Sequence, residues 1–296
     1  MFPGLLGNEH IQKNLEAALS KGHISHFYLL SGPEGSGKHT LARLLAAAIL
    51  CSGDRKPCLH CTPCRKVMDG THPDFITVDD PEKKTVPVDL IRQARADMYI
   101  QPNESDHKIY LFPRAQDMGL PGQNALLKVL EDRRVMLDSA YYNPDDATIP
   151  RYIHDIFHNG LPADFRLVGA TTRSPSEISP ALRSRCMEVF FRALTPEEIA
   201  LIASGAAERA GCAMAKQEAE TIGRYAACGR DAVNIVQMCA GLAQMDERTM
   251  ILPEDVAWVV QSGHYTIHAQ QKADVSNRVG VVHGLAVYGE NQGALL

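Results

Sequence analysis

The sequence predicts an α/β protein built on a parallel sheet with flanking helices. Short apolar segments of strand type alternate with helical segments through roughly the first two thirds of the chain, a pattern typical of parallel strands joined by crossover helices. One such segment, 26–31, runs directly into a glycine-rich turn and an apolar helix. The last third is mainly helical, so a second, helical part is expected after the sheet.

The individual elements follow from periodicity and turn signals. From Thr195 the chain turns helical, with Thr195-Pro196-Glu197-Glu198 as an N-cap and a proline in the first turn. The segment 140–161 is rich in Tyr, Asn, Asp, Pro and Gly, which indicates a long excursion from the sheet. We expect helices at 8–20, 40–50, 88–98 and 120–131, and strands at 26–31, 74–78, 108–112 and 165–170.

Composition excludes some classes of function. With 296 residues, of which 45% are apolar, the chain can bury at least one full core and is expected to form two or three domains. A formal net charge of -5 lacks the basic excess of a stand-alone DNA-binding module. No basic-then-apolar N-terminal signal and no apolar run of about 18 residues is present, which predicts a soluble cytoplasmic protein with no membrane partner.

A phosphate-binding loop is the strongest motif. Gly32 to Lys38 matches G-x-x-x-x-G-K between a strand and a helix, where backbone N–H groups and the helix N-terminus face the phosphates of ATP. Lys38 would reach the β- and γ-phosphates. The predicted nucleotide-binding residues are Gly32, Pro33, Glu34, Gly35, Ser36, Gly37, Lys38, His39 and Thr40.

The residues that would hold Mg²⁺ are replaced. The position after Lys38 normally supplies a hydroxyl, but it is His39, and Thr40 lies on a different face of the helix. The strand that should end on a carboxylate continues as Phe112-Pro113-Arg114. Asp117 lies further along and is better interpreted as a turn residue. The pattern puts Mg²⁺ in doubt and predicts ATP binding with weak or absent hydrolysis.

Four cysteines within fourteen residues predict a zinc knuckle at 51–64. Cys58, Cys61 and Cys64 are spaced C-x-x-C-x-x-C and follow Cys51, which supplies four thiolates for a closed tetrahedral Zn²⁺ site. The alternative is a partial site in which His60 or a water replaces Cys51, because Cys51 ends an apolar helix. A closed site is structural and performs no chemistry. The other four cysteines are scattered and indicate reduced core thiols.

The first 131 residues contain several recognisable segments: LLGNEHIQKNLEAAL, HFYLLSGPEGSGKHTLARLLA, the cysteine cluster, HPDFITV and KIYLFPRAQDMGLPGQNALLKVLE. Together they resemble the delta-prime subunit family of bacterial DNA polymerase III clamp loaders. The resemblance implies an AAA+ fold in a five-subunit ring, in which a degenerate nucleotide site is common. It also implies other AAA+ subunits, the sliding clamp and primer-template DNA as partners.

The rest of the chain resembles a second family. The segments RRVMLDSAYYNPDDATIPRYIHDIFHNGLPADFRLVGATTRSPSEISPALRSRCMEVFF, GRDAVNIV, PEDVAWVVQSGHY and RVGVVHGLAVYGENQGALL resemble the ATPase module and first peptidase strands of B-type Lon-like proteases. A segment like NALLKVLED occurs in both families, so a junction is expected within 124–132. The resemblance implies protein substrates, but the peptidase Ser and Lys would lie beyond Leu296, so no catalytic residue is named.

Three further site residues come from the second half. Thr172, after Thr171 at the end of a buried strand, resembles a polar sensor of the γ-phosphate, with an ordinary turn threonine as the alternative. Arg185 in Ser184-Arg185-Cys186 resembles an arginine that reaches a neighbouring subunit's nucleotide, with Arg183 as its rival. Arg230 resembles a second sensor arginine of the lid, with an exposed arginine near a helix start as the alternative.

The two resemblances together predict the domains and the function. We expect an AAA+ nucleotide-binding domain over 1–194, a helical lid domain over 195–262, and a linker with the start of a truncated peptidase domain over 263–296. The favoured function is an ATP-binding clamp-loader subunit of delta-prime type in DNA replication. The alternative is the ATPase fragment of an ATP-dependent Lon-like serine protease.

Overall fold

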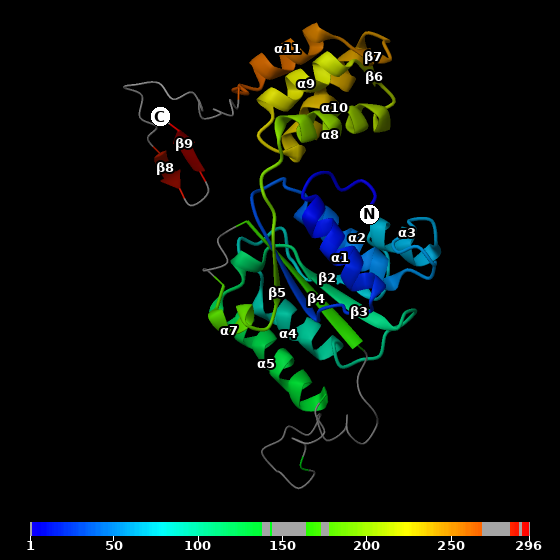
Figure 1. The fold of residues 1–296 in the computed structure, drawn as a ribbon, viewed down its shortest axis with the longest axis vertical. Helices are drawn as coiled ribbons and strands as arrows, with labels where there is room; N and C mark the ends of the chain where they lie inside the picture. The colour runs from blue at the N-terminus through cyan, green and yellow to red at the C-terminus, as the bar shows by residue number, and fades with distance from the viewer. Residues whose placement is uncertain are drawn as a thin grey trace. The chain divides into compact units, whose positions relative to one another are not determined.

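A computed structural model describes residues 2–137, 143, 164–172, 178–267, 285–289 and 292–295. Its contacts divide the chain into two compact units. The first comprises Met1–Gly32 and Lys38–Phe191, and the second comprises Pro33–Gly37 and Arg192–Leu296. We call them the sheet unit and the helical unit and describe each by itself (Figure 1). The expected excursion at 140–161 lies outside the described residues apart from Asn143.

The sheet unit contains a five-stranded sheet in which every neighbouring pair is parallel. The strand order is β2-β3-β4-β1-β5, which confirms the predicted α/β class. β5 has no counterpart among the expected strands, because it is a four-residue edge strand with one buried residue and so lacks a clear apolar run. The strands are β1 (Phe27–Ser31), β2 (Phe75–Thr77), β3 (His107–Phe112), β4 (Asp164–Thr171) and β5 (Met187–Phe190).

Helices cover both faces of this sheet (Figure 1). Successive residues of β1 point to opposite faces, so Tyr28 and Leu30 enter one apolar core while Phe27 and Leu29 enter the other. The first core is closed by α1 (Glu9–Ser20), α2 (Lys38–Leu50) and α3 (Thr62–Asp69). The second is closed by α4 (Val88–Asp97), the 3₁₀ turn η1 (Ala115–Asp117), α5 (Leu120–Leu137) and α7 (Pro180–Arg183).

The expected junction at 124–132 falls inside α5, which runs as one helix from Leu120 to Leu137. An α-helix keeps its period through such a segment, so a join at this point preserves the order of strands and helices on both sides. The bounds of the expected domains remain predictions. In the structure the sheet unit ends at Phe191, and residues 33–37 belong to the helical unit.

The helical unit has a core of its own, formed by buried residues of four helices. Thr195 and Glu198 form the predicted capping box, because the Thr195 side chain accepts from the Glu198 N–H and the Glu198 carboxylate accepts from the Thr195 N–H. Gly223 permits close helix packing, since a Cβ there would lie 2.4 Å from the Pro196 carbonyl oxygen. The helices are α8 (Pro196–Arg209), α9 (Lys216–Tyr225), α10 (Gly229–Met245) and α11 (Pro253–Ser262).

Short strands complete the described elements. β6 (Ala213–Met214) and β7 (Met250–Ile251) form a parallel pair within the helical unit. β8 (Leu285–Gly289) and β9 (Gln292–Leu295) form an antiparallel pair near the C-terminus. The described helices include none that is both long and apolar enough to cross a membrane.

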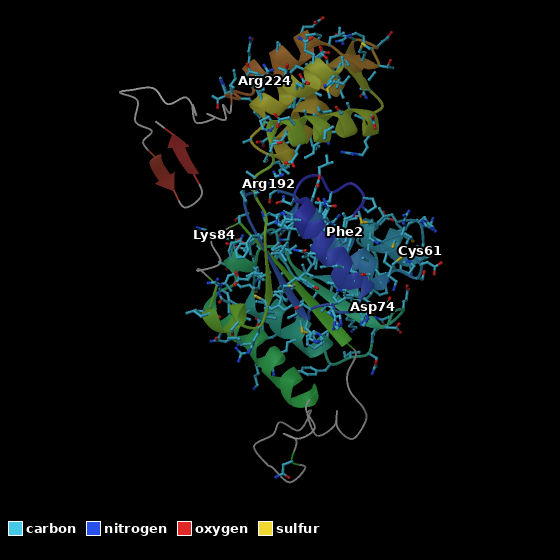
Figure 2. The ribbon with its side chains drawn as sticks, in the orientation of Figure 1. Phe2, Cys61, Asp74, Lys84, Arg192 and Arg224 are labelled. Atoms are coloured by element: carbon cyan, nitrogen blue, oxygen red, sulfur yellow. The ribbon has the colours of Figure 1, made fainter. Side chains whose placement is uncertain are left out.

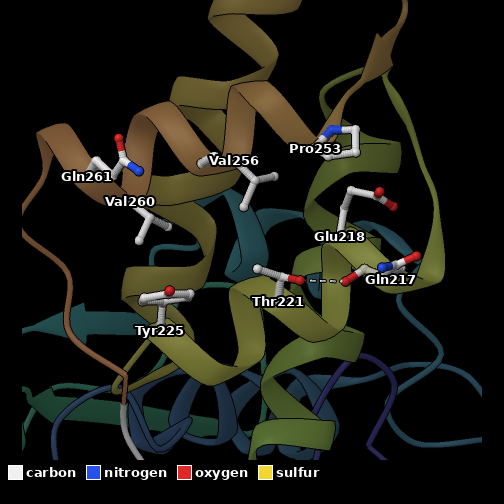
Figure 3. A pocket seen from close by; sticks show the side chains of 9 residues that line it. Gln217, Glu218, Thr221, Tyr225, Pro253, Val256, Val260 and Gln261 are labelled. Atoms are coloured by element: carbon white, nitrogen blue, oxygen red, sulfur yellow. Dashed lines mark hydrogen bonds between the residues drawn. The ribbon is translucent and has the colours of Figure 1, made fainter.

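A groove of about 220 Å³ lies between α9 and α11 of the helical unit (Figure 3). Its wall is formed by Val256, Val260, the Tyr225 ring and polar side chains of α9. The Thr221 hydroxyl donates a 2.8 Å hydrogen bond to the Gln217 carbonyl oxygen and is therefore already paired. No residue predicted for the nucleotide site lines this groove, so it is not the site that the sequence indicates.

A buried carboxylate fixes the loop that precedes β3. Asp74, which immediately precedes β2 (Figure 2), accepts backbone N–H bonds from Asn103 at 2.6 Å, Glu104 at 2.8 Å and Ser105 at 3.0 Å. Burial raises the pKa of Asp74, but these hydrogen bonds outweigh it and hold the pKa below its usual value. The carboxylate therefore ties the loop between α4 and β3 to the edge of the sheet.

We expect Asp74→Asn to lower the free energy of unfolding by about 1–3 kcal/mol at pH 7, because backbone N–H donors lose an ionised acceptor. The folded pKa is lowered, so this stabilisation is present above the ordinary pKa of 3.8 and is lost as pH falls through the folded value. Urea unfolding should show the two proteins converging below about pH 4. Asp106→Asn, an exposed carboxylate of the same loop, is the control; an equal loss in both variants would contradict this assignment.

Candidate nucleotide site and cysteine cluster

The glycine-rich loop has the backbone that its sequence predicts. β1 ends at Ser31 and α2 begins at Lys38, so the loop leads directly to a helix N-terminus. Gly32, Gly35 and Gly37 have φ values of 149°, 65° and 96°, a region that favours glycine. A Cβ at Gly32 would lie 2.5 Å from the Phe191 carbonyl oxygen, so no larger residue fits there. The loop can present backbone N–H groups to an anion.

Lys38 is held at the base of this loop. Its residue is only 4% exposed, and its ammonium group donates a 2.8 Å hydrogen bond to the Gly32 carbonyl oxygen. Ten residues of α2 are buried, so the helix that carries Lys38 is fixed in the core of the sheet unit. The positive charge and the α2 N-terminus therefore lie at the same end of the sheet.

The expected sensor residue lies at this end as well. Thr171, the last residue of β4, pairs in register with Ser31, the last residue of β1. Thr172 follows it and is exposed. The parallel sheet thus places Thr172 beside the strand that leads into the glycine-rich loop, although its contact with a phosphate stays a prediction.

His39 contacts the end of β3, a feature that the sequence does not reveal. Its Nε2 lies 3.0 Å from the Pro113 carbonyl oxygen, across 74 residues of chain. Thr40 is exposed on α2. His39 replaces the usual Mg²⁺-binding hydroxyl, and Pro113 replaces the usual carboxylate. The His39 side chain therefore contacts the backbone of Pro113.

Arg114 occupies the end of β3 with a dense set of contacts. Its guanidinium donates to the Asp79 carboxylate at 2.6 and 3.1 Å and to the carbonyl oxygens of Asp80 at 2.8 Å and Lys83 at 3.0 Å. Hydrogen bonding to Asp79 raises the pKa of Arg114. Asp117 lies 3.8 Å from the same guanidinium. Asp79 and Asp117 thus face a cation of the protein itself.

These residues do not fit a Mg²⁺ site of the usual P-loop kind. Mg²⁺ binds oxygen ligands in an octahedral arrangement, normally a hydroxyl at the start of the helix and a nearby carboxylate. In the described chain these positions hold the His39 imidazole, a proline and an arginine. No step of hydrolysis is therefore assigned to this site.

The two arginines of the candidate trans site differ in their surroundings. Arg183 donates to the Glu188 carboxylate at 2.7 and 3.3 Å, which holds it within its own chain. Arg185 is exposed, and one of its N–H groups donates to the Ala181 carbonyl oxygen at 2.8 Å. A contact with another subunit would require less rearrangement of Arg185 than of Arg183.

The helical unit holds the remaining candidate. Arg230 lies in the first turn of α10, and its guanidinium pairs with Glu34, which the contacts group with the same unit. Both side chains are more than half exposed. An ion pair this exposed contributes little to stability, so Arg230 can exchange Glu34 for another anion at small cost.

The four predicted cysteines converge at the C-terminal end of α2. The Sγ atoms of Cys51, Cys58, Cys61 and Cys64 all lie within 4.8 Å of one another, with Cys51 to Cys61 at 3.9 Å and Cys58 to Cys64 at 4.0 Å. Cys61 is labelled in Figure 2. A tetrahedral Zn²⁺ with Zn–S bonds of about 2.3 Å separates its sulfurs by about 3.8 Å. The donor set therefore fits zinc.

The surroundings affect the Cys61 and Cys64 thiols in opposite directions, because burial raises the pKa of Cys64. Burial raises the pKa of Cys61, but hydrogen bonds from the Cys64 and Ser52 backbones and from neighbouring thiols outweigh it and lower the pKa to about 6. His60 is exposed, with its Nδ1 2.8 Å from the Cys58 carbonyl oxygen, and does not belong to the cluster. The cluster thus favours the four-cysteine interpretation over replacement of Cys51.

Comparison with known proteins supports both resemblances. The family described as DNA polymerase III, delta subunit, matches residues 7–135. Lon protease 2 of Bacillus subtilis is 51% identical over 173 residues, covering 58% of this chain and 31% of that protein. DNA polymerase III subunit gamma of Buchnera aphidicola (Schizaphis graminum) is 28% identical over 246 residues, covering 82% of this chain and 59% of that protein.

Solved structures establish the fold. The Thermotoga maritima RuvB Holliday junction branch migration motor aligns with a TM-score of 0.58 at 19% identity, covering 87% of this chain and 70% of that one. The FIGL-1 AAA domain in complex with ADP aligns with a TM-score of 0.54 at 13% identity, covering 91% and 86%.

The chain has an AAA+ fold. It is related to the clamp-loader subunits of DNA polymerase III and to Lon, and its two similarities agree with the expected hybrid of two AAA+ families. The chain spans about a third of the length of Lon protease 2 and 59% of the Buchnera gamma subunit. The FIGL-1 AAA domain was solved with bound ADP.

We expect the purified protein to contain about one zinc ion per chain. Cys61→Ser should release the metal and lower the melting temperature, because one of four ligands is lost. Elemental analysis with thermal unfolding measures both effects, and Cys239→Ser, a buried thiol of the helical unit, is the control that should keep its zinc. Absence of metal after expression with zinc would contradict the assignment.

Proposed function

We propose that this chain is an ATP-binding AAA+ subunit of clamp-loader delta-prime type, which acts in DNA replication and has weak or no hydrolysis of its own. The proposal rests on an intact phosphate-binding motif next to replaced metal ligands at one end of the sheet. The glycine-rich loop and Lys38 are intact, whereas His39 and Pro113 occupy the positions of the metal ligands. Such a subunit can bind nucleotide as a structural element of a ring.

The proposed partners follow from the same assignment. A subunit without its own hydrolysis would depend on other AAA+ subunits in a ring, and would meet the sliding clamp and primer-template DNA through that complex. The match of residues 7–135 to the DNA polymerase III delta family supports this assignment. The net charge of -5 agrees with DNA contact shared among subunits. We propose a cytoplasmic location, as for a replication protein.

A second candidate function rests on a separate observation. The identity of 51% to Lon protease 2 extends over 58% of the chain, and the β8–β9 hairpin lies where the sequence suggests the first strands of a peptidase domain. This candidate is the ATPase part of an ATP-dependent Lon-like serine protease that acts on protein substrates. The two candidates differ in their binding partners. The first would bind other clamp-loader subunits, and the second would bind protein substrates.

We expect ATP to bind with slow turnover. Lys38→Ala should abolish binding, because it removes the main cation of the loop, whereas His39→Thr alone should not restore hydrolysis while Pro113 and Arg114 stand at the carboxylate positions. Equilibrium binding and single-turnover hydrolysis measure the two properties separately.

Lys13→Ala removes the same charge from an exposed site on α1 and should leave binding unchanged. A hydrolysis rate on the order of 1 per second or faster in the unaltered protein would contradict the proposal. Such a rate would direct attention to Asp117, the nearest carboxylate after β3 on the chain.

We expect Arg185→Ala to change nucleotide affinity or turnover only in assemblies, because its exposed guanidinium would act on a neighbouring subunit. Nucleotide binding should be measured in dilute monomer and in the reconstituted ring. Arg65→Ala, an exposed arginine of α3, is the matched control. Equal effects of Arg185→Ala in monomer and ring would rule out a role in trans.

A further inference from the structure

The contact of His39 with Pro113 bears on whether the loop binds ATP with or without Mg²⁺. In most P-loop sites Mg²⁺ is held jointly by the nucleotide phosphates, a helix hydroxyl and a carboxylate, so chelating the metal weakens binding. Here the helix position is an imidazole, and its Nε2 lies 3.0 Å from the carbonyl oxygen of Pro113. The two positions that would share a metal contact each other directly.

The carboxylates near the end of β3 already interact with the Arg114 guanidinium. The Asp79 carboxylate accepts three hydrogen bonds from Arg114, and Asp117 lies 3.8 Å from the same guanidinium. Arg114 is further held by the carbonyl oxygens of Asp80 and Lys83. Moving either carboxylate to a metal would separate it from this cation and leave the guanidinium with fewer partners, which costs free energy.

The positive charge that remains does not depend on a metal. The Lys38 ammonium is buried at the loop, and Lys38 is itself the first residue of α2, a helix of thirteen residues. The ammonium and the helix N-terminus both attract phosphate oxygens. Because Mg²⁺ carries a double positive charge, a metal-free nucleotide is more anionic than its Mg²⁺ complex, and this attraction is correspondingly stronger.

We infer that this glycine-rich loop binds ATP in the metal-free form, with the His39–Pro113 contact closing the position that Mg²⁺ takes in other P-loop sites. The inference rests on the proposed nucleotide binding and adds the chemical form of the ligand. It makes the site a receptor for the free polyphosphate and not for the metal complex.

The test compares ATP affinity of the purified, zinc-loaded full chain in Mg²⁺-free buffer without a chelator and in excess Mg²⁺, by titration calorimetry or with a fluorescent ATP analogue. We expect affinity without Mg²⁺ to equal or exceed that in Mg²⁺. A loss of affinity of about tenfold or more on omission of Mg²⁺ would overturn the inference while leaving the proposed ATP binding intact. Failure to bind under either condition would overturn the proposed function, and the inference with it.

A rebuilt site tests the cause. The double variant His39→Thr with Pro113→Asp supplies the missing hydroxyl and carboxylate but leaves Arg114 and its partners in place. This variant should bind ATP more tightly with Mg²⁺ than without it, which reverses the order expected for the unaltered protein. A folded double variant with no response to Mg²⁺ would overturn the assignment to these two positions. Folding is checked by the zinc content and the melting temperature.

Discussion

The arrangement of the site depends on the burial of β1 and α2. β1 lies between β4 and β5 with both faces buried, so its register and the position of Ser31 are fixed by two parallel ladders. α2 follows after six residues and fills the core on one face of the sheet. The turn between them has little freedom, and its glycines adopt the φ values that the short connection requires. The burial of β1 and α2 therefore fixes both ends of the predicted phosphate-binding loop.

The glycine-rich loop, the cysteine cluster and the capping box could be predicted because each is encoded in a short stretch of sequence. The motif from Gly32 to Lys38, the spacing of Cys58, Cys61 and Cys64, and the Thr195 capping box each lie within a few residues of chain. The structure brings the cysteines together and forms the capping box as expected. The α/β class was equally accessible, since fully buried parallel strands appear as short apolar runs.

The contacts that distinguish this site are long-range and leave no such signal. His39 lies 74 residues from Pro113, and Arg114 lies 35 residues from Asp79. The sequence shows which ligands are missing but not that their replacements contact each other. Asp74 has the same character, because its partners are about 30 residues away in an irregular loop. β5 was not predicted for a different reason, because an edge strand of four residues has little apolar pattern.

The cysteine cluster and the glycine-rich loop are attached to the two ends of one helix. The Cys64 thiol donates to the carbonyl oxygen of Ala47 at 3.4 Å, while Lys38 begins the same helix at its other end. A packed helix of this length transmits displacement with little bending. The loop and the cysteine cluster thus depend on the packing of one helix. Local unfolding of α2 would therefore disturb the loop and the thiol cluster together, although they are at opposite ends of the helix.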